Sequence, residues 1–171
     1  MLERSQILAR FRAQSWVPER PGSDKAPRLG EQAFPTQVGT TSRGSPRILC
    51  LGPGDWLIVS REQTSSGLRQ RLDPDLAGQG LALVDVTDAW VTLEVHGPSA
   101  RDLLAKGCGL DLHRHSFVSG RCARTRCAQI PVILECLDDS PRFELSVARS
   151  YFDYLHSWLK DAAAEFGERR A

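Results

Sequence analysis

The chain has 171 residues, of which 22 are Lys or Arg and 21 are Asp or Glu, so its formal net charge at pH 7 is +1. This balance lacks the basic surface that binds nucleic acid or anionic membranes, and no apolar run reaches the roughly 20 residues of a membrane span. The N-terminal stretch is charged throughout and has no apolar signal core. We therefore expect a cytoplasmic protein that binds neither nucleic acid nor membrane.

The first 46 residues differ in composition from the rest, because they hold five of the ten prolines. Ile7, Leu8 and Phe11 have the spacing of one apolar helical turn, but the stretch VPERPGSDKAPRLGEQAFP cannot hold regular structure for long. We predict that residues 1–46 form an extended N-terminal arm, which lies on its own domain or on a partner. Residues 47–171 are predicted to form a single α+β domain.

From residue 47 onward, short apolar strands alternate with helices. Two strands are predicted at RILCL and WLIVS, joined by the turn GPGD, and a short helix follows at EQTSSGLRQRL. Two further strands are predicted at GLALVDVT and WVTLEVHG. The second of them alternates apolar and polar residues over residues 91–96, which indicates a strand with one face in water.

The second half of the chain repeats this order. A helix is predicted from Pro98 to Gly107, and strands are predicted at RCARTRCAQI, VILECL and RFELSV. A last helix, from residue 150 to about residue 166, is expected to bury one stripe, formed by Tyr151, Tyr154, Leu155, Trp158, Leu159 and Ala162. Strand–strand–helix thus occurs about three times, which predicts an α+β fold with a mostly antiparallel sheet of short strands and helices on one face.

Motifs for catalysis are absent from the sequence. GPGDWL lacks the third glycine of a dinucleotide-binding loop, and GPSAR does not match a hydrolase nucleophile elbow. Zinc needs four converging ligands; Cys108, His113, His115 and Cys122 are the candidates, but only the two histidines form a tight pair. A small zinc protein is thus one alternative, and buried reduced thiols are the favoured interpretation of the cysteines.

Three stretches carry a resemblance to a known family. They are LGPGDWLIVS, FELSVARSYFDYLHSWL and, most specific, residues 97–125, which combine a Gly-Pro helix start with KGCGLDLH and FVSGRCART. Over about residues 47–160 the chain resembles the gamma subunit of heterotetrameric sarcosine oxidase. It departs from the family at Gly54, in a Gly-Asp-Trp triplet where the family usually reads Asp-Glu-Trp, and at Arg114, where the family usually has proline.

The resemblance implies a fold similar to the folate-binding aminomethyltransferase domain. It also implies a complex that oxidises sarcosine or a related N-methyl or secondary amino acid, with tetrahydrofolate as co-substrate. The alpha, beta and delta subunits of such a complex would hold FAD, FMN, NAD and zinc. The gamma subunit would hold none of these and would be a non-catalytic, structural subunit.

We therefore expect no catalytic, cofactor-binding or metal-binding residue in this chain. Residues that contact the other subunits are expected among exposed aromatic and basic side chains, and the candidates are Trp16, Trp56, Trp90, His113, His115, Arg121 and Arg124. The remaining alternative is a stand-alone folate-binding or aminomethyl-transferring protein, with Asp85 or Asp88 contacting the pterin.

Overall fold

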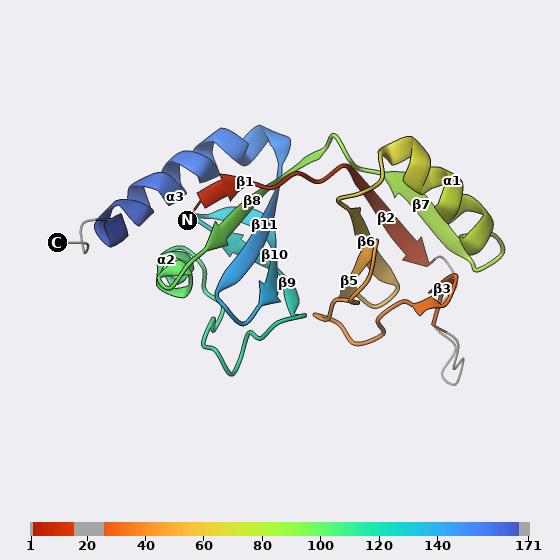
Figure 1. Cartoon of the computed structure of the whole chain (residues 1–171), viewed down its shortest axis with the longest axis horizontal. Helices are drawn as coiled ribbons and strands as arrows, with labels where there is room; N and C mark the ends of the chain where they lie inside the picture. Colours follow the sequence, from red (N-terminus) through yellow and green to blue (C-terminus); the bar gives the residue numbers. More distant parts are fainter. Residues whose placement is uncertain (1, 16–25, 168–171) are drawn as a thin grey trace. The chain divides into compact units, whose positions relative to one another are not determined.

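The computed structural model describes residues 2–15 and 26–167 (Figure 1). It divides the chain into two compact units, which we call the N-terminal unit (Gln6–Thr87) and the C-terminal unit (Met1–Ser5 with Asp88–Ala171). Each unit contains an antiparallel sheet and at least one helix, so the prediction of an antiparallel α+β fold is confirmed. None of the helices in the described ranges is long and apolar enough to cross a membrane.

The N-terminal unit is a four-stranded sheet with order β5-β6-β2-β7, accompanied by a small hairpin of β3 and β4. One face of the sheet packs against α1, whose Leu68 and Leu72 are fully buried together with Phe11 and Ile58. The elements are β2 (Ala9–Ser15), β3 (Arg28–Leu29), β4 (Gln32–Ala33), β5 (Arg47–Gly52), β6 (Asp55–Ser60), α1 (Ser65–Leu76) and β7 (Leu81–Asp85).

Neither compact unit begins at residue 47, where the sequence predicted the start of the domain. Part of the segment predicted as an arm is instead a central strand, β2. β2 pairs with β6 on one side and with β7 on the other. Its buried residues Ala9, Phe11 and Ala13 follow the two-residue period of a strand, so the helical spacing of Ile7, Leu8 and Phe11 does not correspond to a helical turn. The prolines that follow β2 led to the prediction of irregular structure for the whole segment, so this short strand was not predicted.

The C-terminal unit is a five-stranded sheet with order β1-β8-β11-β10-β9. Its core joins Leu93, Leu134 and Leu145 of the sheet to Leu104 of α2 and Leu155 of α3. The elements are β1 (Leu2–Arg4), β8 (Trp90–His96), α2 (Ala100–Ala105), β9 (Cys122–Cys127), β10 (Ile130–Asp138), β11 (Arg142–Ala148), the 3-10 helix η1 (Arg149–Tyr151) and α3 (Phe152–Gly167).

From residue 47 onward, the predicted order of strands and helices matches the structure, with one difference in pairing. β7 and β8 are consecutive in sequence, but β7 pairs with β2 in the N-terminal unit and β8 pairs with β1 and β11 in the C-terminal unit. The second strand–strand–helix repeat is therefore not a structural unit. Order along the chain does not determine which strands exchange hydrogen bonds.

The last helix buries a narrower stripe than predicted. Leu155 and Leu159 are fully buried, whereas Tyr151 is 46% exposed and Tyr154 is 53% exposed. Tyr151 belongs to the 3-10 turn that precedes α3, and Tyr154 lies about 100° around the helix from Leu155. The prediction that both tyrosines belong to the core is therefore wrong.

Candidate functional site

The loop between α2 and β9 carries the histidines that the sequence singled out, and two buried side chains anchor it. Leu112 and Phe117 are 4% and 6% exposed. The guanidinium of Arg101 donates hydrogen bonds to the carbonyl oxygens of both residues, and its central carbon lies 5.0 Å from the centre of the Phe143 ring. Arg101 therefore fixes both ends of the segment that contains the histidines.

Local hydrogen bonds hold the backbone of this loop in place. The backbone N–H of His113 donates to Oδ1 of Asp111 at 3.0 Å, and the His113 carbonyl accepts from the amides of Ser116 and Phe117. The hydrogen bond from the Ser116 side chain, and then that from the His113 amide, lower the pKa of Asp111. His113 and His115 are exposed, with ring centres 5.2 Å apart, so the loop presents both imidazoles to solvent.

The structure does not bring the four proposed zinc ligands together. Cys108 and Cys122 are 7% and 2% exposed within the unit, while the two histidines lie on the exposed loop. In the described ranges no group of three His, Cys, Asp or Glu residues is arranged to hold a metal ion. All five cysteines are free and buried. Burial, aided by the neighbouring Cys108, raises the pKa of the Cys127 thiol to about 12, which makes it a poor nucleophile.

A surface pocket of about 510 Å³ lies beside the histidine loop, lined by Arg101, Arg114, His115, Val118, Asp139 and Pro141. Arg101 and Arg114 are positively charged, the imidazole of His115 can donate a hydrogen bond, and Asp139 is the one acidic side chain of this lining. Such a set fits a carboxylate better than a cation. Sequence reasoning selected only His115 from this group. The sequence placed Arg101 on the polar side of its helix, but this position does not distinguish it from any other polar helix residue.

The face of the C-terminal sheet opposite the helices is polar but buried. Thr92 and Glu94 are 1% and 8% exposed, so the prediction that this side of β8 faces water is wrong. The guanidinium of Arg142 donates two hydrogen bonds, of 2.6 and 3.1 Å, to the carboxylate of Glu94. These hydrogen bonds raise the pKa of Arg142. The Thr92 and Ser146 hydroxyls lie 2.7 Å apart. Hydrogen bonding makes this burial tolerable.

The tryptophan candidates differ in their surroundings. Trp56 is 4% exposed, its Nε1 donates to the Pro35 carbonyl at 2.8 Å, and its ring meets Phe34 edge-on at 5.4 Å. It is thus a core residue of the N-terminal unit, with almost no indole surface to offer a partner. Trp90 is half-buried at the start of β8, and Trp16 lies outside the described residues.

The arginine candidates lie at the edge of the C-terminal sheet. Arg121 is half-buried immediately before β9, and Arg124 is exposed on β9. β9 is the last strand of its sheet. Of the seven predicted interface residues, the described structure therefore exposes His113, His115 and Arg124.

The two aspartates considered as pterin contacts belong to different units. Asp85 accepts hydrogen bonds from the Ser65 hydroxyl and the Thr87 amide, so its carboxylate ties the end of β7 to the start of α1. Asp88 is exposed, and its carboxylate lies 3.7 Å from Nη2 of Arg149. Asp85 thus has a structural role, and the two carboxylates are not part of one compact unit.

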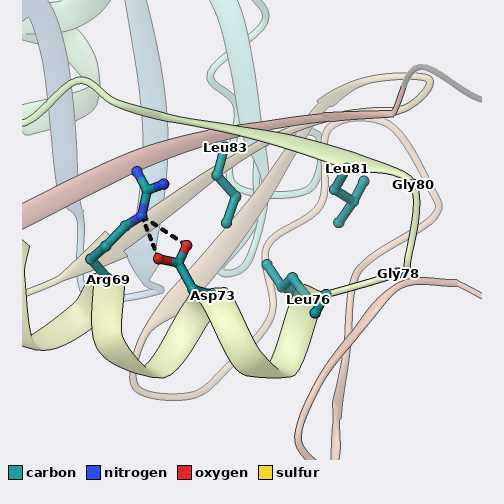
Figure 2. A pocket seen from close by; sticks show the side chains of 8 residues that line it. Arg69, Asp73, Leu76, Gly78, Gly80, Leu81 and Leu83 are labelled. Carbon is teal, nitrogen blue, oxygen red and sulfur yellow. Dashed lines mark hydrogen bonds and ion pairs between the residues drawn. The ribbon is translucent and has the colours of Figure 1, made fainter.

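A second pocket, of about 460 Å³, lies between α1 and β7 in the N-terminal unit (Figure 2). Leu81 and Leu83 point from the strand toward the helix, and Leu76 closes the helix side. The ion pair of Arg69 with Asp73, at 2.7 Å, lies at the polar end of the pocket. The pocket is therefore apolar at its base and charged at its rim.

Comparison with known sequences places these features in a family context. The family model described as "Sarcosine oxidase, gamma subunit family" matches residues 29–165. A sarcosine oxidase subunit gamma from Arthrobacter sp. is 33% identical over 78% of this chain and 65% of its own length. The corresponding subunit from Corynebacterium sp. (strain P-1) is 30% identical over 91% of this chain and 78% of its own length.

Two solved structures resemble the fold. A chain of a heterotetrameric sarcosine oxidase from Corynebacterium sp. U-96, in complex with pyrrole 2-carboxylate, matches with a TM-score of 0.84 and 24% identity over 96% of this chain and 84% of that chain. The glycine cleavage system aminomethyltransferase T from Bartonella henselae matches with a TM-score of 0.68 and 14% identity, over 92% of this chain and 44% of that chain. The predicted likeness to the aminomethyltransferase fold is therefore confirmed.

Proposed function

Because the chain belongs to the sarcosine oxidase gamma subunit family, we propose that it is a non-catalytic assembly subunit of a heterotetrameric sarcosine oxidase. A related complex that oxidises or dehydrogenates another N-methyl or secondary amino acid is included in this proposal. The observation that carries it is the family match over residues 29–165, which spans most of both compact units.

The surroundings of the reactive side chains support a non-catalytic role. Cys127 has a raised pKa, and Cys108 is buried beside it. Asp85 is engaged in hydrogen bonds that join two elements of its own unit. A nucleophile or general base needs access to substrate and a pKa matched to its task. The two thiols are buried, and the hydrogen bonds that the Asp85 carboxylate accepts lower its pKa. The chemistry of the complex is thus assigned to its other subunits.

The proposal includes the composition of the complex. The partners are alpha, beta and delta subunits in the cytoplasm, which hold FAD, FMN, NAD and zinc, and tetrahydrofolate is the co-substrate. Within this chain, His113, His115, Arg121, Arg124 and Trp90 are proposed to contact those partners, together with Trp16, which lies outside the described residues. Trp56 is left out of this set because it fills the core of its own unit.

Co-expression with the genes that neighbour this one tests the proposal. An affinity tag on this chain should recover flavin-containing subunits in fixed stoichiometry, and the recovered complex should reduce its flavin when sarcosine is added. Asp139→Ala is the control variant. It changes the lining of the 510 Å³ pocket but leaves the basic residues in place, so it should recover the same subunits as the wild-type chain. Recovery of this chain alone, as a stable monomer without flavoprotein, would contradict the proposal.

A further inference from the structure

The outer edge of β7 is less protected than the other sheet edges of the described residues. At β5, the opposite edge of the same sheet, the Cys50 amide donates to Thr40 and the Gly39 amide donates to Cys50, both at 2.9 Å, so the chain covers that edge itself. In the C-terminal sheet, β1 has only three residues and β9 exposes the charged Arg124 and Arg126. Short length, charge and cover are the usual protections of an edge.

Within residues 2–15 and 26–167, β7 has none of these protections until its last residue. Its sequence is LALVD, and it ends the sheet beside β2 (Figure 1). Leu81 and Leu83 face α1, while Ala82 and Val84 face the other way and are exposed, Val84 by 54%. An apolar run on both faces is typical of a strand that is covered on both faces. In the part of the chain that the structure describes, this strand instead has one uncovered face and one uncovered edge.

The hydrogen-bond register shows which backbone groups point outward. The Val86 amide donates to the Arg10 carbonyl, and the strands pair with Phe11 opposite Asp85. Residues of an antiparallel strand alternate between those that bond their partner and those that do not. Ala82 and Val84 therefore bond to β2, while the N–H and C=O groups of Leu81 and Leu83 point away from it.

The pocket of Figure 2 lies where a strand added at this edge would place its side chains. Residues directly opposite one another in a sheet share a face, so the residue that pairs with Leu83 would point toward α1. There it would enter the 460 Å³ pocket, between Leu76 and the Arg69–Asp73 ion pair. Edge and pocket together form one docking surface for extended backbone and an apolar side chain.

We propose that the outer edge of β7 binds an extended segment of another subunit of the complex, by addition of one strand with an apolar side chain in the α1–β7 pocket. This inference rests on the proposed function. A second copy of this chain fits less well, because the side chains that its own β7 would place on this face are Leu81 and Leu83. Both already pack against the core of their own unit, so neither is available to fill the pocket.

Hydrogen exchange resolved to single amides tests the geometry directly. In the free full-length chain, the outward amides of Leu81 and Leu83 exchange quickly and those of Ala82 and Val84 exchange slowly. In the purified complex, the outward amides should slow by about tenfold or more, so that the alternation along β7 disappears. The amide of Cys50, covered by the chain itself, serves as an internal control that changes little.

Two matched substitutions test whether the edge contributes to assembly. Val84→Lys places a charge on the edge strand, which is a natural means of blocking strand addition, and should weaken binding of the partner subunits by about tenfold or more. Val38→Lys alters another exposed valine of the same unit, 48% exposed, and should leave binding unchanged. Leu83→Pro, which removes an outward N–H, should weaken binding further, and thermal melting shows whether each variant folds.

The outcomes separate this inference from the proposed function. Failure of the wild-type chain to recover flavoprotein subunits would remove the proposed function itself. A complex that forms with unprotected amides at Leu81 and Leu83, and that tolerates Val84→Lys, would overturn the docking site alone. Protection of these amides already in the free monomer would assign the edge to this chain's own segment, and protection that grows with protein concentration would assign it to a second copy. Either result would also overturn the proposal.

Discussion

The two units share a plan of helices on one face of an antiparallel sheet and an arginine–carboxylate pair on the other. In the C-terminal unit Arg142 binds Glu94, and in the N-terminal unit Arg12 binds Asp55 at 3.0 Å through both oxygens. Each pair bridges adjacent strands on a diagonal of two residues. In both pairs the arginine side chain is 41% exposed and the carboxylate side chain 11%.

The units differ in the edge strands of their sheets and in the number of helices and cysteines that they contain. The C-terminal unit has a five-stranded sheet, two helices against this sheet and four of the five cysteines. The N-terminal sheet has four strands, one principal helix and an apolar edge at β7. The same plan therefore yields one unit with blunted edges and one with an edge that can accept a further strand. The sheet edge, and not the core, distinguishes the two units as binding surfaces.

The largest effect is expected from the core of the C-terminal unit. Leu155→Ala removes a fully buried side chain that packs in the main cluster, and it should lower the free energy of unfolding by about 2–5 kcal/mol. Urea denaturation followed by circular dichroism measures the loss. Leu72→Ala in α1, also fully buried, should cost a similar amount in the N-terminal unit.

Tyr154→Ala is the matched control for this prediction. Tyr154 is adjacent to Leu155 in the sequence but is 53% exposed, so its truncation should change stability by no more than about 0.5 kcal/mol. A large loss at Tyr154 would restore the original prediction of a wider core stripe. The assignment of Tyr154 to the exposed face of α3 would then be wrong.

Much of the fold was predictable because long apolar patterns are strong signals. The strands β5, β6, β8, β10 and β11 and the helix α1 lie close to the predicted stretches. β2 was missed, because its pattern ARFRAQS places arginines between small or aromatic residues and precedes a proline-rich stretch. The pairing of β7 with β2 was not predictable from local patterns, since register depends on contacts between residues about 70 positions apart.

If the two arginine–carboxylate pairs contribute equally to stability, removal of either arginine should lower the free energy of unfolding by the same amount. Arg142→Ala and Arg12→Ala each remove charged donors from a carboxylate that is 11% exposed. Each should cost about 1.5–3 kcal/mol, below the cost for a fully buried pair because the arginines are partly in water. Arg126→Ala on the exposed side of β9 should cost no more than about 0.5 kcal/mol.

Denaturation curves of the three arginine variants measure the comparison. Equal losses for Arg142→Ala and Arg12→Ala, with little change for Arg126→Ala, would show that both sheets depend on their diagonal pair. A large loss in one unit and none in the other would show that the geometric likeness of the pairs has no energetic counterpart. Their contribution to stability would then have to be assigned unit by unit.

A smaller effect is expected at the junction of α2 and α3. A Cβ added at Gly107 would meet the Trp158 ring at 2.5 Å and the Ala128 amide nitrogen at 3.1 Å. Gly107→Ala should therefore destabilise by about 1–2 kcal/mol, an overpacking cost reduced by the lower backbone entropy of the unfolded alanine chain. At Gly109 an added Cβ has no atom within 4 Å, so Gly109→Ala should be neutral. Equal melting temperatures for the two variants would contradict this.

Gly107 also shows the limit of the sequence analysis of the site. The sequence predicted a glycine that ends a helix, and Gly107 does directly follow Lys106, the C-cap of α2. The close approach of Trp158 is a second reason for glycine at this position, and no local pattern indicates it. Likewise the histidines were recognised by their type, whereas Arg101, which holds their loop, resembles any polar helix residue in the sequence. Side chains that act through tertiary contacts leave no local pattern, so they were visible only in the structure.

The smallest effects concern one aspartate in each unit. Burial alone would raise the pKa of Asp85, but hydrogen bonds from Ser65 and Thr87 and the charge of Arg69 together lower it. In the C-terminal unit, hydrogen bonds from the Ser116 side chain and the His113 amide lower the pKa of Asp111.

A lowered native pKa means that the folded chain binds fewer protons than the unfolded chain near pH 4. The resulting stabilisation is present above that pH and is lost as the pH falls through the native pKa. Carboxyl NMR titration should show Ser65→Ala raising the pKa of Asp85 alone and Ser116→Ala raising that of Asp111 alone, while Ser66→Ala changes neither.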